Sequence, residues 1–235
     1  NNCIITISNS DISGNYIKGT YASGCIVNII DSKIANNGYL HTDDGIYGTD
    51  QGGGVDLNDS DINISNSQIE NNAAVTGGGI YLNICDASII DSMIAYNQAW
   101  GGGGGGIYSS CTSLNIENTI ISENSSDQRE QWISAGGIMV SYYDGQGQRY
   151  IEGSFEIIDS VISDNIGGND PAGISVEGGN CLIDNCSIFS NHADFFGGIS
   201  IYNSNTTIKN TKIKKNSAAL YGAGIGILDC DSVDV

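Results

Sequence analysis

Carboxylates and basic side chains that could act on an acidic sugar polymer occur in two loop-like stretches of the sequence. Asp43 and Asp44 lie in the first stretch, and Arg129 and Arg149 lie in the second. Lyase or hydrolase chemistry needs a group that moves a proton and a positive charge that neutralises the substrate carboxylate. Asp43, Asp44, Arg129 and Arg149 are therefore the candidate catalytic residues if the protein is an enzyme.

The same acidic stretch could bind calcium. Asp43, Asp44 and Asp50 supply the hard oxygen ligands that calcium prefers, and an extracellular acidic protein would meet this ion at high concentration. No spaced calcium-binding loop is present, however, and Asp is common in turns. The sequence predicts no required cofactor and offers these three residues as the candidate metal ligands.

Four further residues are candidates for binding a sugar: Tyr81, Tyr108, Trp132 and Asp56. Asp56, Tyr81 and Tyr108 occupy the same position in successive repeats, where a row of aromatic rings would offer a flat strip for stacking on sugars. Aromatic rows also stabilise sheets without binding any ligand. Both interpretations of the row stay open at this point.

The charge of the chain limits its partners. Eight Lys and Arg stand against 27 Asp and Glu, which gives a net charge of −19 over 235 residues. An acidic surface repels phosphate and anionic lipid, so nucleic-acid binding is not expected. No apolar run has the roughly 20 residues of a membrane helix, and direct membrane insertion is not expected either.

A repeated phrase dominates the sequence. It reads Ile, any residue, Asn or Asp, Ser, Thr or Cys, any residue, Ile, two residues, Asn, and it occurs eight times. The base period is about 25 residues, and two repeats are longer. The additional residues fall within 38–61 and 125–153. The closing residues of the phrase are Asn15, Asn37, Asn72, Asn97, Asn124, Asn165, Asn191 and Asn216.

A second phrase, two small residues followed by Ile or Val, separates the copies of the first, as in Gly78-Gly79-Ile80 and Gly197-Gly198-Ile199. The segments Ile80-Tyr81-Leu82 and Ile199-Ser200-Ile201 alternate with a period of two, as half-buried strands do. Asn or Asp followed by Ser suits a tight bend. Short strands and corners that return every 25 residues predict an all-β parallel solenoid with an Ile interior and Asn ladders.

The stretches IENNAAVTGGGIYL, IFSNHADFFGGISI and IKKNSAALYGAGIGIL combine Ile-x-x-Asn-x-Ala with a Gly-rich Ile segment. They resemble the right-handed parallel β-helix repeats of chlamydial polymorphic outer-membrane proteins and archaeal adhesin-like proteins. The resemblance implies a right-handed single-stranded parallel β-helix of about eight to nine coils, with loop expansions in two of them. It also implies a secreted or cell-surface protein, and the same fold is used by pectate-lyase-like enzymes.

Residues 1–235 are expected to form a single β-helix segment, part of a longer chain. Adjacent coils would bring Cys3 near Cys25 and Cys85 near Cys111, close enough for disulfides or for a stack of buried thiols. Cys181 and Cys186 flank one corner and could also pair, whereas Cys230 has no partner in this segment.

Two functions compete. The first is a non-enzymatic extracellular stalk, filament or adhesin-like passenger that presents loops. The second is a polysaccharide lyase, hydrolase or epimerase whose cleft is built from the two expansions beside Tyr81 and Tyr108. Partners expected for the first are surface glycans, host proteins, or further copies of the chain that associate through the solenoid ends.

Overall fold

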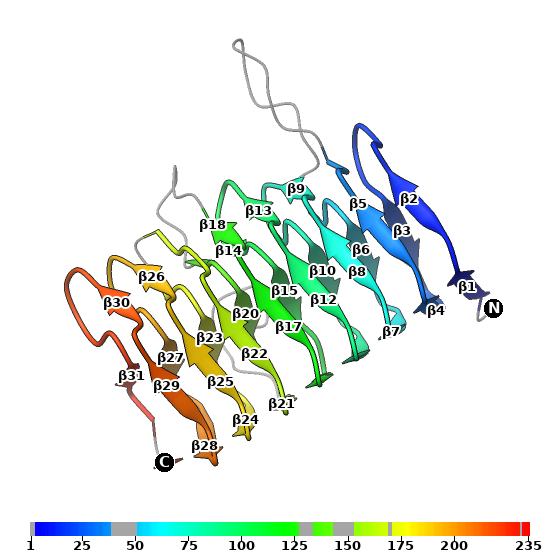
Figure 1. Ribbon diagram of the computed structural model, residues 1–235. Coiled ribbons are helices and arrows are strands. Elements are labelled where there is room, and N and C mark those ends of the chain that lie inside the picture. The colour runs from blue at the N-terminus through cyan, green and yellow to red at the C-terminus, as the bar shows by residue number, and fades with distance from the viewer. Residues whose placement is uncertain (1–2, 39–50, 127–133, 143–152, 169–170, 231) are drawn as a thin grey trace.

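A computed structural model describes residues 3–38, 51–126, 134–142, 153–168, 171–230 and 232–235. These residues form strands and turns and no helix, so no described segment is a helix that could span a membrane. The strands stack in parallel into a β-solenoid of about eight turns (Figure 1). The prediction of an all-β parallel solenoid is confirmed.

Three parallel sheets run along the solenoid, and each coil contributes one strand to each sheet. Sheet A contains β1 (Cys3–Ser8), β4 (Cys25–Ile30), β7 (Asp61–Ser65), β11 (Asp86–Ile90), β16 (Ser113–Glu117), β21 (Ser154–Ile158), β24 (Asn180–Asp184), β28 (Asn205–Lys209) and β32 (Val233–Asp234). Sheet B contains β2 (Asp11–Ser13), β5 (Lys33–Ala35), β8 (Gln68–Glu70), β12 (Met93–Ala95), β17 (Ile120–Ser122), β22 (Val161–Ser163), β25 (Ser187–Phe189) and β29 (Lys212–Lys214). Sheet C contains β3 (Thr20–Ser23), β6 (Val55–Asn58), β10 (Ile80–Asn83), β15 (Ile107–Ser110), β20 (Ile138–Ser141), β23 (Ile174–Glu177), β27 (Ile199–Tyr202) and β31 (Ile225–Leu228).

Short strands of two residues each bridge the turn between sheet B and sheet C. They are β9 (Ala73–Ala74), β13 (Gln98–Ala99) and β18 (Ser125–Ser126), then β14 (Gly103–Gly104) with β19 (Ser134–Ala135), and β26 (His192–Ala193) with β30 (Ser217–Ala218). They extend the pairing of successive coils beyond the three main sheets.

The strand register follows the repeated phrases. The residue after each Gly pair aligns across sheet C, so Val55 pairs with Ile80 and Ile80 with Ile107. In sheet A, Ile64 likewise pairs with Ile89, and Ile89 with Ile116. Equal positions therefore stack on one another, as expected when each coil donates its backbone hydrogen bonds to the next.

Isoleucine fills the interior because each strand points every second side chain inward. Ile69, Ile94 and Ile121 form one such column in sheet B and are almost completely buried. Stacked β-branched side chains suit this surface because they pack well on a pleated sheet. The resulting core runs the length of the solenoid.

The first corner, between sheets A and B, uses the Asn/Asp-Ser part of the phrase. Its Asn or Asp adopts a left-handed backbone, as Asp31 does with φ of 50° and Asn66 with φ of 49°. The following hydroxyl accepts a backbone N–H from the preceding coil and donates to the carbonyl two residues earlier. Ser67 shows both contacts, at 3.1 Å from Ser32 N and 2.7 Å from Ser65 O.

The second corner, after sheet B, carries the closing Asn of every phrase. The Asn124 side-chain oxygen accepts both the backbone N–H and the side-chain amide of Asn97, at 3.0 Å each. The Asn124 amide donates to the Ile94 carbonyl at 2.9 Å and to the Asn165 oxygen at 3.0 Å. The expected Asn ladder is confirmed, and its six central members are at most 1% exposed.

Glycine precedes sheet C because neighbouring coils come too close for a side chain. A Cβ on Gly54 would lie 2.6 Å from the Gly79 carbonyl oxygen and 2.9 Å from the Asn72 amide nitrogen. The Gly pairs thus allow the Asn ladder to pack against the start of each sheet C strand.

The third corner, between sheets C and A, varies from coil to coil. The chain turns there through Gly24-Cys25 in the first coil and through Gly178-Gly179 in the sixth. In the fifth coil Tyr142 occupies this corner and is completely buried. Tyr142 falls within the 125–153 expansion of the sequence, yet its ring fills the interior beside Gly153 and Gly179, which lack the side chains that would block it.

Candidate functional site

The candidate ligand-binding residues form one outward-facing row on sheet C. Asp56, Tyr81 and Tyr108 pair in register on β6, β10 and β15, as the repeat predicts. The remaining members of the row are Tyr21, Met139, Ser175, Ser200 and Gly226. The row points away from the Ile core, yet Asp56, Tyr81 and Met139 are each at most 8% exposed.

Asp56 is held by an ion pair. The Lys18 ammonium contacts the Asp56 carboxylate, and the Asn58 amide donates to the other carboxylate oxygen at 3.0 Å. Lys18 also lies over the Tyr21 ring, 5.2 Å from its centroid. Because Asp56 is only 1% exposed, its negative charge needs this partner inside the protein.

Lys18 was not among the candidate residues that the sequence suggested. The residue lies in the turn before β3, 38 residues from Asp56, and only the coil-to-coil register brings the two together. A usable signal was present: Lys18 precedes the Thr20-Tyr21 segment, which keeps the nine-residue step to the next phrase. With the row aligned in register, Lys18 is a basic residue one coil away from Asp56.

Tyr81 and Tyr108 stack on each other instead of presenting a shared open face. Their ring centroids are 5.2 Å apart and the ring planes differ by 8°. The Gln51 amide donates to the Tyr81 hydroxyl at 3.2 Å. Burial, with smaller contributions from Tyr108 and Asp56, raises the pKa of Tyr81 to about 12, and burial also raises the pKa of Tyr108.

A polar row runs beside the tyrosines, two residues further along each strand. The Asn83 amide donates to the Asn58 oxygen at 3.2 Å, and the Ser110 hydroxyl donates to the Asn83 oxygen at 2.9 Å. In the fifth and sixth coils the Ser141 hydroxyl donates to the Glu177 carboxylate at 3.0 Å. Glu177 is 6% exposed, so this face of sheet C holds two buried carboxylates, Asp56 and Glu177, on either side of the tyrosine stack.

The proposed enzyme and metal residues are not among those that the structure describes. Asp43, Asp44, Asp50, Arg129, Arg149 and Trp132 lie outside the described residues. Within the described ranges, no group of three or more His, Cys, Asp or Glu side chains could hold a metal ion. The catalytic and calcium predictions therefore stay predictions.

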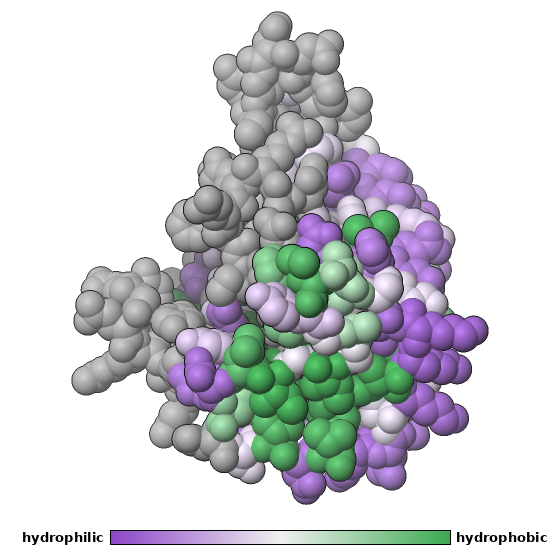
Figure 2. Space-filling model, turned by 90° about the vertical axis from the view of Figure 1, so that its left-hand side faces the viewer, coloured by the Kyte–Doolittle hydropathy of each residue, from purple (hydrophilic) through white to green (hydrophobic). Residues whose placement is uncertain are grey.

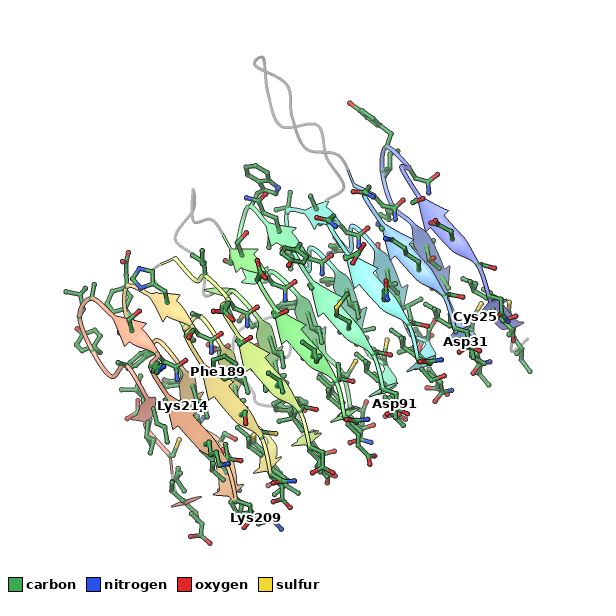
Figure 3. All side chains as sticks on the ribbon, viewed as in Figure 1. Cys25, Asp31, Asp91, Phe189, Lys209 and Lys214 are labelled. Carbon is green, nitrogen blue, oxygen red and sulfur yellow. The ribbon has the colours of Figure 1, made fainter. Side chains whose placement is uncertain are left out.

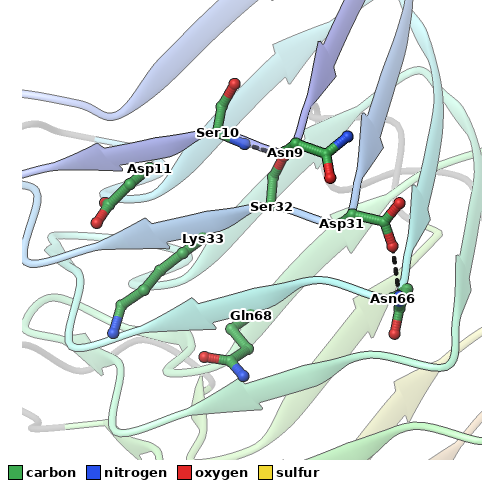
Figure 4. A pocket seen from close by; sticks show the side chains of 8 residues that line it. All are labelled: Asn9, Ser10, Asp11, Asp31, Ser32, Lys33, Asn66 and Gln68. Carbon is green, nitrogen blue, oxygen red and sulfur yellow. Dashed lines mark hydrogen bonds between the residues drawn. The ribbon is translucent and has the colours of Figure 1, made fainter.

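A shallow depression lies at the first corner of the N-terminal coils, with a volume of about 510 Å³ (Figure 4). Asp31 accepts a hydrogen bond from Asn66 there, and Lys33 lies on the strand beside Asp11. Lys33 pairs with Glu70 at 2.5 Å, which raises the pKa of the lysine. The depression is open and polar, and its lysine is already paired within the protein.

Basic side chains concentrate in the last full coil of an otherwise acidic protein (Figure 3). Lys209 pairs with Asp184 at 3.3 Å, and Lys214 lies 5.7 Å from the centroid of the Phe189 ring. Figure 2 looks onto this end of the stack, where apolar side chains are also gathered. The exposed large apolar residues of the last coil are Leu220, Tyr221, Ile227 and Leu228.

Comparisons with known proteins return no relative. No protein-family model matches the chain. No curated protein matches it, and no solved structure matches it either. The fold and the site geometry therefore carry the functional argument.

Proposed function

We propose that this chain is an adhesin-like structural β-solenoid, secreted or displayed at a cell surface, that extends from its attachment point and presents loops. Its partners would be surface glycans, host proteins or further copies of the chain. The likeness of its repeats to those of chlamydial and archaeal surface proteins supports the same assignment. No cofactor is required for this role, and any calcium bound by Asp43, Asp44 and Asp50 would act on the loop that contains them.

The observation that carries the proposal is the continuity of the ladders. From Asn15 to Asn216 every coil repeats the same amide contacts, and the hydroxyl ladder repeats alongside it at the first corner. Such repetition makes a stiff rod, because each coil is bonded to both neighbours along three sheets. A rod that carries loops at fixed positions along its axis is suited to presenting those loops to a partner.

The outer face of sheet C also supports a structural role. A polysaccharide-cleaving enzyme needs free carboxylates and a basic group that converge on an accessible substrate. Asp56 is instead buried and neutralised by Lys18, and Tyr81 is covered on one face by Tyr108. The described part of this face therefore fits a packed ladder better than an open catalytic cleft.

Binding assays on the intact chain test the proposal. The chain would be immobilised and probed with an array of neutral and acidic glycans and with cell-surface extracts. A variant that lacks residues 39–50 should lose binding, whereas Asn63→Ala on the exposed face of sheet A should keep it. Binding unaffected by removal of each expansion in turn would overturn the loop-presentation proposal.

The competing enzyme function rests on the candidate catalytic residues of the two expansions, Asp43, Asp44, Arg129 and Arg149, and on the Tyr81–Tyr108 stack. Incubation with uronate polymers, with and without calcium, separates the two functions. Release of unsaturated or shortened oligosaccharides that is lost in Arg129→Ala or Arg149→Ala would establish the enzyme. Intact polymer after prolonged incubation supports the structural role.

A further inference from the structure

The cysteines separate into two kinds once the coils are stacked. All seven are present as thiols in this structure, and Cys85, Cys111, Cys181 and Cys186 are buried. What distinguishes them is the neighbour of each sulfur atom. Two pairs have another thiol beside them in the next coil, and the Cys25 and Cys85 thiols also donate to the Ser23 and Asn83 carbonyls. For the other three cysteines, the hydrogen-bond partners that the structure describes are not thiols.

Cys85 and Cys111 meet at the third corner of successive coils. The Cys85 carbonyl accepts the backbone N–H of Thr112 at 2.9 Å, which fixes Cys111 one residue from the Cys85 register. Their thiols lie within hydrogen-bonding reach of each other, and both side chains are at most 3% exposed. Strands of adjacent coils lie about 4.8 Å apart, so a residue one position out of register is within the Cα separation that a disulfide spans, about 4.4–6.8 Å.

Cys3 and Cys25 meet in the same corner column at the start of the chain. They are register partners on β1 and β4, and their thiols are also within hydrogen-bonding reach. This pair is more accessible than the first, because Cys3 is exposed and Cys25 is only partly buried. In-register residues on adjacent strands lie about 4.8 Å apart, again within the range of a disulfide.

The remaining three cysteines hold other positions. Cys181 packs inward between Phe155 and Thr206 in sheet A and hydrogen-bonds to the Thr206 hydroxyl. Cys186 replaces a hydroxyl in the first-corner ladder, where its thiol donates to the Asp184 carbonyl at 3.2 Å and its N–H donates to Thr211. The Cys230 thiol donates to the Leu228 carbonyl at 3.2 Å.

We propose that Cys3–Cys25 and Cys85–Cys111 are disulfide sites that tie successive coils together, whereas Cys181, Cys186 and Cys230 remain thiols. With glutathione disulfide as oxidant, one protein thiolate attacks a glutathione sulfur and releases one glutathione. The second protein thiol then loses its proton and displaces the other glutathione, so two thiols become one disulfide and two glutathione molecules form.

Cys85 and Cys111 influence each other's titration. The hydrogen bond from Cys111 lowers the pKa of the Cys85 thiol, and the same contact together with burial raises the pKa of Cys111. The thiolate is the reactive form, so whichever of the two ionises attacks the oxidant and the other resolves the mixed disulfide. Each bond would form in an oxidising compartment and would restrain the chain between two coils.

The test is oxidation of the intact chain in a glutathione redox buffer, followed by thiol counting in denaturant. The reduced protein has seven thiols, and two disulfides consume four, so three should remain. The mass should fall by about 4 Da relative to the reduced protein. Trypsin cleaves after Lys18 and would leave Cys3 and Cys25 on linked peptides, and chymotrypsin cleaves at Tyr96 and Tyr108 between Cys85 and Cys111.

Two variants separate this assignment from general thiol oxidation. Cys111→Ser should leave four thiols after oxidation and only the Cys3–Cys25 link. Cys186→Ser should leave two thiols and both links. Seven thiols in the oxidised wild-type chain, or a Cys181–Cys186 link in its peptide map, would overturn the proposal, and the wild-type map gives this answer even if a variant does not fold.

Discussion

The second and third corners of the solenoid both turn the chain from one sheet to the next, but only the second uses the same residue type in every coil. At the second corner every coil places an Asn, and the same amide contacts repeat from Asn37 to Asn191. At the third corner the residue type changes from coil to coil, from Cys85 to Tyr142 to Gly179. Both corners connect strands of neighbouring sheets, yet only one has a fixed chemistry.

The difference follows from burial of backbone groups. At the second corner the Asn side chain bonds to backbone groups that would otherwise be buried without partners, such as the Ile94 carbonyl. At the third corner the connection between strands varies in length, and Tyr142 and Gly153 are separated there by ten residues that lie outside the described part of the chain. The second corner therefore specifies the fold. The third corner is free to hold cysteines, the buried Tyr142 ring and an expansion of the sequence.

The largest effect is expected from Asn124→Ala at the second corner. The change removes the acceptor for two donors of Asn97 and the donor to the Ile94 carbonyl. Each orphaned buried group costs about 1–3 kcal/mol, so we expect a loss of about 4 kcal/mol. Urea unfolding followed by circular dichroism measures it.

Asn63→Ala is the matched control on an exposed surface. The Asn63 amide donates to the Asn28 oxygen at 3.1 Å, but both residues face solvent on sheet A. An exposed polar substitution usually changes stability by no more than about 0.5 kcal/mol. Equal losses in Asn63→Ala and Asn124→Ala would show that the buried ladder has no special role.

The next effect is expected at the third corner, from Gly179→Ala. The new Cβ would lie 2.5 Å from the Tyr142 ring and 2.8 Å from the Gly153 carbonyl oxygen. Overpacking of this kind adds to the strain of a positive φ, and we expect a loss of about 3 kcal/mol. Thermal and urea unfolding would both report it.

Gly24→Ala separates the clash from the backbone strain. Gly24 occupies the same corner with φ of 68°, close to the 67° of Gly179, but no atom lies within 4 Å of its added Cβ. Only the left-handed backbone is penalised there, which costs about 1 kcal/mol. If the two alanine variants lose the same stability, Tyr142 does not fill the interior as described.

A smaller change of opposite sign is expected from Tyr142→Phe. The Tyr142 hydroxyl is buried and has no hydrogen-bond partner in the described part of the chain. Removing an unsatisfied buried hydroxyl while keeping the ring should leave stability unchanged or raise it by about 1 kcal/mol. Tyr96→Phe is the control, because its exposed hydroxyl donates to Glu123 at 2.8 Å. Clear destabilisation by Tyr142→Phe would mean that an ordered water satisfies the hydroxyl.

The sequence predicted the second corner well and the third corner poorly, for a physical reason. The Asn ladder and the Ile columns repeat with every coil, so their period could be read directly from the spacing. A tyrosine that fills the interior, Tyr142, occurs in one coil, and nothing in its local sequence distinguishes such a residue from a loop residue. Its burial depends on the absence of side chains at Gly153 and Gly179, which only the stacked coils bring against its ring.

The contacts of the candidate site also include some that the repeat predicts and some that it does not. The alignment of Asp56, Tyr81 and Tyr108 follows from the repeat and was predicted. The Lys18–Asp56 pair was not, because it joins a turn in one coil to a strand in the next across the first expansion. Contacts that recur in every coil can be inferred from one sequence, whereas contacts that occur once need the structure.

The smallest effect is expected when the pH is lowered. Acid should reduce stability through Asp184, beside the first corner, and should not affect the uncharged Asn ladder at the second corner. Hydrogen bonding from Asn210, together with Lys209, lowers the pKa of Asp184. A lowered pKa contributes stability that is present above the usual Asp value of about 4 and is lost as pH falls through the folded value. Asp184→Asn should therefore be less stable than wild type at pH 7, and the gap between the two urea midpoints should narrow as the pH falls below about 4. A gap that stays constant from pH 7 to pH 3 would show that Asp184 acts through its shape and not through its charge.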